Sequence, residues 1–170
     1  MNDKTAVFEA NLKLPAGFDD RSRIWFYTAN RDLTESEIDF IQEKLAIFIP
    51  NWTAHNNRLK AFGQVFFNRV LLIMVDETQA GVSGCGIDKS VQFVENTGKQ
   101  LGIDFFNRMI IGTKQNDTIE FMPLNLFVEK IKNGELATHT LVLDTLLTSK
   151  QEFDKYLFRP ANSTWLKRFV

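Results

Sequence analysis

The chain has few of the residues from which small proteins often build a site or a scaffold. Its 170 residues include one cysteine and two histidines. A single cysteine cannot form an internal disulfide, which agrees with a reducing compartment. The longest aliphatic and methionine run, Val70 to Val75, is far too short to span a bilayer, and residues 1–17 lack the apolar stretch of a signal peptide. We therefore expect a cytoplasmic protein without membrane insertion.

An excess of charge of one sign is also lacking. Twenty basic residues stand against twenty-one acidic ones, and no stretch gathers Lys and Arg into a stripe. Because nucleic-acid binding depends on neutralising phosphates, this composition argues against nucleic acid as the main partner. Phenylalanine is abundant instead, with 16 copies, which we expect to form an aromatic core rather than a platform for stacking bases.

The first half of the chain predicts strands and helices that pack on one sheet. Residues 23–28 are rich in aromatic residues and predict a strand, and a helix with a capping box at Thr34 follows until Pro50. Residues 59–67 alternate as a strand does. Residues 70–75 carry no polar alternation, so both faces of that strand should be covered. We predict an α+β fold with a mainly antiparallel sheet, centred on these last two strands.

The second half predicts a smaller ββαβ-like part. Residues 109–113 and 118–122 indicate two strands, Pro123 begins a helix, and residues 140–143 indicate a short strand before a last helix capped by Ser149. The tail keeps apolar residues and should dock.

In terms of domains, residues 1–22 are expected to be extended or partly disordered. Residues 23–170 should form one α+β domain, which can divide into subdomains 23–102 and 103–170.

The most informative stretch is RVLLIMVDETQAGVSGCGIDKS, residues 69–90. It places Asp76 at the end of the apolar strand, the single Cys85 in a loop of small residues, and Asp88 as the expected N-cap of a helix that Gly102 ends. Proteins with helices and sheets often hold ligands or nucleophiles at such a junction. We therefore predict a small-ligand or partner-binding site near the GVSGCGID loop.

A nucleotide site is the first possibility, because LLIMVDE resembles a Walker B strand and VSGCG resembles the signature of ABC ATPases. Reading back from Lys89 and Ser90, the glycine positions of a phosphate loop hold Ser83 and Asp88, and an acid there repels phosphate. The ABC signature also precedes the Walker B strand, whereas here it follows. The chain is therefore not expected to be a genuine ABC ATPase.

Thiol chemistry is a second possibility. A thiol near a helix N-terminus ionises more readily, so Cys85 could be a nucleophile, with His55 as its base and Asp76 or Asp88 orienting the imidazole. Asp88 disfavours the thiolate, while Lys89 favours it. These residues predict a thiol-dependent hydrolase or transferase, unless Cys85 is a small packed residue.

The same residues also have other interpretations. Asp76 could be a strand-end residue that accepts hydrogen bonds from loop amides. His55, Cys85 and an aspartate could ligate zinc, but no paired ligand spacing is present, so we predict neither metal nor cofactor. The binding site then includes Trp52, Ser83 and Asp88 beside the three candidate catalytic residues.

Several segments together carry a resemblance to a known family. They are IWFYTANRDLTESE, NWTAH, NRVLLIMVDE, GVSGCGIDKSVQF, GIDFFNRM, THTLVLD and STWLKRF, which span nearly everything from Ile24 to Phe169. In this order they resemble a small uncharacterised bacterial family often labelled "ABC transporter ATPase" despite lacking Walker A. The resemblance implies a bacterial cytoplasmic protein and carries no catalytic residue across.

Residues 109–144 carry a second resemblance. Two strands followed by PLNLFVEKIKNGELATHTLV resemble the strand-helix-strand part of GYF-type domains, which bind proline-rich peptides through aromatic grooves. The sequence Met122-Pro123-Leu124 stands where those domains have a Gly-Pro-aromatic signature. The resemblance implies a peptide-binding adaptor, for which Phe121, Phe127 and Trp165 should not all be buried.

Overall fold

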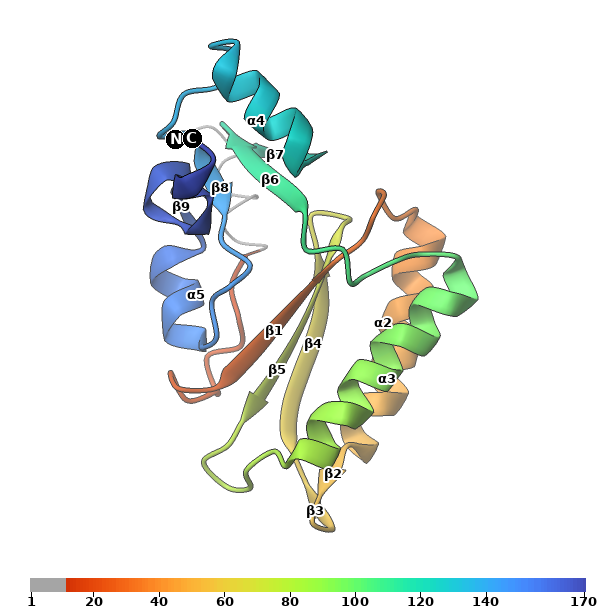
Figure 1. Ribbon diagram of the computed structural model, residues 1–170. Helices are drawn as coiled ribbons and strands as arrows, with labels where there is room; N and C mark the ends of the chain where they lie inside the picture. The colour runs from red at the N-terminus through yellow and green to blue at the C-terminus, as the bar shows by residue number, and fades with distance from the viewer. Residues whose placement is uncertain (1–11) are drawn as a thin grey trace. The chain divides into compact units, whose positions relative to one another are not determined.

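The computed structural model describes residues 12–170, which separate into two compact units (Figure 1). Among the described residues, the larger unit comprises residues 14–107 and 148–151, and the smaller unit comprises residues 12–13, 108–147 and 152–170. In the described residues the helices are α2 (Glu35–Asn51), α3 (Gly84–Leu101), α4 (Leu124–Lys132) and α5 (Lys150–Tyr156), with short 3-10 helices at Ala161–Ser163 and Trp165–Arg168. The strands are β1 (Arg23–Thr28), β2 (Thr53–Ala54), β3 (Asn57–Arg58), β4 (Lys60–Phe66), β5 (Val70–Asp76), β6 (Ile110–Gln115), β7 (Thr118–Pro123), β8 (Leu141–Leu143) and β9 (Phe158–Pro160).

Strand β5 is the middle of the sheet in the larger unit, which has the order β1-β5-β4. Both neighbours run antiparallel to it, and all seven residues of β5 are buried. The sequence prediction that both faces of this strand are covered is confirmed. Strand β4 does not share the centre as predicted, because β1 occupies the other side of β5 and leaves β4 at an edge.

Helices α2 and α3 pack on one face of this sheet (Figure 1). Helix α2 begins with the predicted capping box, in which Thr34 accepts from the N–H of Glu37 and the Glu37 carboxylate accepts from the N–H of Thr34. It buries Ile41 and Leu45. The Leu45 side chain lies so close to Gly63 of β4 that a Cβ there would be 2.6 Å from it, so a glycine at this position allows the helix to approach the sheet.

The N-terminus of α3 differs from the prediction. Asp88 is not its N-cap, because the helix already begins at Gly84 and Asp88 lies in its second turn. Ser83 is the N-cap, with an extended backbone and a hydroxyl that accepts from the N–H of Gly86 at 3.2 Å. The predicted end at Gly102 is confirmed, since its φ of 63° is left-handed. Cys85 consequently lies within the first helical turn rather than in a loop.

The smaller unit contains a sheet of order β7-β6-β8-β9, with antiparallel pairs throughout. Strands β6 and β7, helix α4 and strand β8 follow one another along the chain, so the predicted ββαβ-like part is confirmed. Its buried core consists of Ile111, Met122, Phe127, Val142, Ala161 and Leu166. Trp165 and Phe169 pack against this core, and the C-terminal tail docks as predicted.

The predicted N-terminal segment, residues 1–22, falls partly outside the described residues, which begin at residue 12. From Leu14 onward the chain belongs to the larger unit, with Leu14 and Ser22 buried. The subdomain boundary was predicted after residue 102. In the structure the larger unit continues to Asn107, and residues 148–151 also belong to it. No helix in residues 12–170 is long and apolar enough to cross a membrane.

Candidate functional site

Trp52 connects the start of α3 with residues 52–54, which follow α2, through a hydrogen bond. Its side chain is only 1% exposed, and its indole Nε1–H donates to the carbonyl oxygen of Gly86 at 2.8 Å. A Cβ added at Gly86 would lie 2.9 Å from a methyl group of Val82 and 3.6 Å from the Cβ of Ala54. The first turn of α3 is therefore held closely against residues 52–54. Trp52, predicted as a ligand contact, is a buried support of this arrangement.

Residues 53–58 form a short hairpin beside the first turn of α3 (Figure 1). Strands β2 and β3 pair antiparallel, and the two residues between them, His55 and Asn56, have φ angles of 50° and 66°. Two positive φ angles are typical of a type I′ turn, whose twist matches that of the strands. This geometry presents the His55 side chain to solvent, where it is exposed.

The start of α3 carries Ser83, Cys85 and Asp88. Ser83 is engaged in capping, whereas Cys85 is exposed at the second helical position. Asp88 is exposed one turn later, and the neighbouring Lys89 reaches back to the carbonyl oxygen of Thr53 at 3.4 Å. We call residues 52–58 and 83–89 together the hairpin–helix platform.

Asp76 is buried and already has several hydrogen-bond partners. Its carboxylate accepts from the hydroxyl of Thr78 at 2.6 Å, the N–H of Thr78 at 3.0 Å, the N–H of Asp19 at 3.2 Å and the ammonium of Lys60 at 2.9 Å. The Thr78 hydroxyl above all, with Lys60 and the two N–H groups, holds the pKa of Asp76 well below its usual value of 3.8, although burial alone would raise it. Lys60 also donates to the carbonyl oxygen of Gly17.

This set of contacts corresponds to the simpler of the two interpretations of Asp76. The carboxylate accepts from loop amides at the end of β5 and ties residues 17–19 to the sheet. None of its contacts with the described residues involves His55 or Cys85. The geometry therefore gives Asp76 a structural role.

The predicted site residues are thus only partly brought together. Trp52, Ser83, Cys85 and Asp88 belong to the hairpin–helix platform, and His55 directly follows Ala54, which packs near Gly86. Within residues 12–170, no hydrogen bond joins the Cys85 thiol to His55 or to another base. In the same residues no group of three or more His, Cys, Asp or Glu side chains could hold a metal ion.

The sequence did not identify Gly86 and Asn56 as parts of the platform. Gly86 is required by close packing, and Asn56 by its left-handed backbone. Asparagine is the residue that, after glycine, most readily adopts this conformation, so the Asn56-Asn57 pair was the available signal for a turn.

The aromatic residues named for an adaptor lie in the smaller unit. Phe127 is completely buried, whereas Phe121 and Trp165 are partly exposed. The adaptor hypothesis therefore remains a prediction, with Trp165 as the residue of interest.

Comparison with known proteins gives no family to which the chain can be assigned. No protein-family model, no curated protein and no solved structure matches it. A function must therefore be argued from the geometry and charge of the described residues.

Proposed function

We propose that the protein binds a small ligand on the hairpin–helix platform. One observation carries this proposal: a closely packed support presents chemically active side chains that the described fold does not use. Trp52 and Gly86 fix the platform through a buried hydrogen bond, while His55, Cys85 and Asp88 are exposed and have no hydrogen-bond partner among residues 12–170. Binding groups are most effective when a rigid support orients them.

The chemistry of the platform favours a ligand with a carboxylate or phosphate group. The N–H groups of Gly84 and Cys85 belong to the first helical turn, where no intrahelical acceptor exists, and the N-terminus of an 18-residue helix carries partial positive charge. Lys89 adds a full positive charge nearby. Asp88 opposes binding of an anion, so it limits which anions fit. The Cys85 thiol lies where it would contact the remainder of the ligand.

Alkylation of Cys85 tests this proposal, because the chain has no other cysteine and the mass of the intact protein reports on one site. We compare the rates with iodoacetate, which is anionic, and iodoacetamide, which is neutral. If the platform attracts anions, the rate with iodoacetate divided by the rate with iodoacetamide should be larger for the protein than for an unstructured cysteine peptide. Replacing Lys89 by Gln should lower the ratio.

A matched control is available on the same helix. Lys99 lies in the last turn of α3 and is also exposed, so Lys99→Gln should leave the ratio of rates unchanged. A wild-type ratio equal to that of the peptide, or equal effects of the two lysine substitutions, would refute binding of anions at the platform.

A second candidate function is a thiol-dependent hydrolase or transferase that uses Cys85 with His55 as base. It is favoured by the exposure of both side chains on adjoining parts of the platform. Catalysis predicts multiple turnovers of p-nitrophenyl acetate, abolished by Cys85→Ser and strongly reduced by His55→Gln. A binding protein predicts at most one acetyl group transferred to Cys85, with no turnover.

A further inference from the structure

Strand β4 forms an open edge of the sheet in the larger unit (Figure 1). It pairs with β5 on one side, and no other strand of residues 12–170 pairs with it. Within the same part of the chain, residues 61–65 make no backbone hydrogen bond besides those with β5. The outward N–H and C=O groups of β4 are therefore free to pair with another strand.

Strand β4 lacks the features by which proteins usually keep an edge strand from pairing. Those features are short length, proline, a bulge and charged side chains. The strand is seven residues long, its register with β5 is unbroken from Lys60 to Phe66, and residues 61–66 include neither proline nor charge. Its one charged group, the ammonium of Lys60, is engaged by Asp76 and Gly17.

The opposite edge of the same sheet is partly covered. At the start of β1, the N–H of Ile24 donates to the carbonyl oxygen of Thr148 at 3.0 Å, and Arg23 forms a β-bridge with Ser149. Residues 148–151 belong to the larger unit, so the chain itself covers this part of β1. Residues 12–170 give β4 no corresponding cover.

The side chains of β4 are complementary to those of a second β4 that runs antiparallel to it. Successive residues of a strand point to opposite faces, so Phe62, Gln64 and Phe66 share one face, whereas Gly63 and Val65 share the face toward α2. With Gln64 opposite its own copy, Phe62 lies opposite Phe66, and Gly63 lies opposite Val65. Aromatic pairs across strands stabilise a sheet, and an amide can both donate to and accept from an identical amide.

The charge of β4 is also compatible with a second copy. Antiparallel pairing centred on Gln64 places the two Lys60 residues at opposite ends of the joined strands, about 27 Å apart at about 3.4 Å per residue. This separation exceeds the Debye length at physiological salt, so the two ammonium groups repel each other little. Because each copy supplies the same open edge, one contact with two-fold symmetry pairs both edges.

We propose that the protein forms a homodimer through β4, in which two sheets of three strands join into one antiparallel sheet. The partner is a second copy of this chain, and backbone hydrogen bonds join the two β4 strands with Gln64 at the two-fold axis. Addition of a strand to a sheet edge is a common mode of recognition between proteins. A contact limited to one pair of strands is small, so the dimer should be weak and its population should rise with protein concentration.

Sedimentation equilibrium of the full chain tests the proposal. Wild type should change from monomer to dimer with a dissociation constant below about 1 mM. Gln64→Lys and Gln64→Glu should each weaken dimerisation about tenfold or more, because like charges then face each other at the two-fold axis. An equimolar mixture of the two variants should recover dimerisation, because the facing charges are then opposite. Recovery in the mixture also shows that both variants fold.

Gln92→Lys and Gln92→Glu are the matched controls, since Gln92 is exposed on α3. These two variants should have the wild-type dissociation constant, both separately and mixed. The proposal is overturned if wild type stays monomeric up to about 1 mM, which would leave the edge to water or to a different protein. It is also overturned if the Gln64 variants dimerise like wild type, if their mixture does not recover dimerisation, or if the Gln92 variants have the same effects.

Discussion

Replacement of Asp76 by Asn should destabilise the protein strongly while leaving the hairpin–helix platform as reactive as before. The substitution keeps the size of the side chain but removes its charge and turns one of its acceptor oxygens into a donor. Asp76 is 2% exposed and receives four hydrogen bonds, including that of the Lys60 ammonium. An amide placed there cannot satisfy all these donors.

The magnitude follows from the burial of the pair. Breaking a buried ion pair by removing one partner costs roughly 3–5 kcal/mol. The Lys60 side chain is 37% exposed, so water can solvate its ammonium when Asp76 is replaced. We therefore expect the lower end, about 3 kcal/mol at neutral pH, which is a large fraction of the stability of a typical domain.

The effect should depend on pH in a defined direction. Because the folded protein lowers the pKa of Asp76, this carboxylate stabilises the fold fully above its unfolded pKa of about 3.9, and the stabilisation is lost as the pH falls below that value. Urea unfolding followed by tryptophan fluorescence should therefore show a difference between wild type and Asp76→Asn that is constant from about pH 7 to pH 5 and shrinks below about pH 4.

Asp88→Asn is the matched control, since Asp88 is exposed and should change the free energy of unfolding by less than about 0.5 kcal/mol at each pH. A loss below about 1 kcal/mol for Asp76→Asn at neutral pH, or a difference from wild type that persists undiminished in acid, would refute the reasoning. In the folded variant, alkylation of Cys85 should proceed at the wild-type rate. A slower rate would instead show that Asp76 affects the reactivity of Cys85.

Two further pairs of substitutions test the start of α3 by urea unfolding. Gly86→Ala should cost about 1–3 kcal/mol, because its methyl group would lie 2.9 Å from a Val82 methyl, whereas Gly84→Ala has open space and should be neutral or slightly stabilising. Equal costs would contradict the packing described for Gly86. Ser83→Ala should cost about 1 kcal/mol, and Asp88→Ala should cost much less. A larger cost for Asp88→Ala than for Ser83→Ala would indicate that Asp88 is the N-cap.

Local signals in the sequence were sufficient for most secondary structure. The capping box at Thr34 and the left-handed stop at Gly102 depend on residues close together in the chain, and both are present. The uninterrupted apolar run of β5 required cover on both faces, and all its residues are buried. Such patterns can be predicted because they depend on residues that are neighbours in the sequence.

The start of α3 was mispredicted for a physical reason. The sequence offers two good N-caps, Ser83 and Asp88, and the glycines between them favoured a loop. What decides between them is the packing of Gly86 against Ala54 and the hydrogen bond from Trp52, which lies 34 residues earlier in the chain. Tertiary contacts of this kind leave no local pattern.

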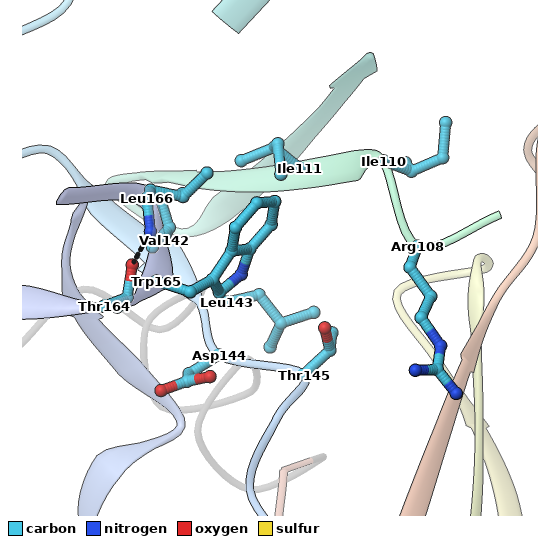
Figure 2. A pocket seen from close by; sticks show the side chains of 10 residues that line it. All are labelled: Arg108, Ile110, Ile111, Val142, Leu143, Asp144, Thr145, Thr164, Trp165 and Leu166. Atoms are coloured by element: carbon cyan, nitrogen blue, oxygen red, sulfur yellow. Dashed lines mark hydrogen bonds between the residues drawn. The ribbon is translucent and has the colours of Figure 1, made fainter. Parts of the chain in front are cut away.

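The small cavity in the smaller unit, where the Trp165 indole lies between Ile111 and Leu143 (Figure 2), could not have been predicted either. Arg108, Thr145 and Trp165 are far apart in the sequence and form no recognised motif. Strands β6 and β8 and the C-terminal tail contribute side chains that line the cavity. The sequence of the C-terminal tail predicted only that the tail packs against the rest of the protein.

The most direct measurement of the central claim is a titration of the ¹⁵N-labelled protein with inorganic phosphate, with the backbone amide signals followed. Ligand binding on the hairpin–helix platform predicts saturable shifts of the amides of Gly84 and Cys85. The amides of Glu35 and Ser36, in the first turn of α2, provide an internal comparison and should move much less. Equal shifts at both helix starts, or no saturable shift at Gly84 and Cys85, would contradict the proposed site.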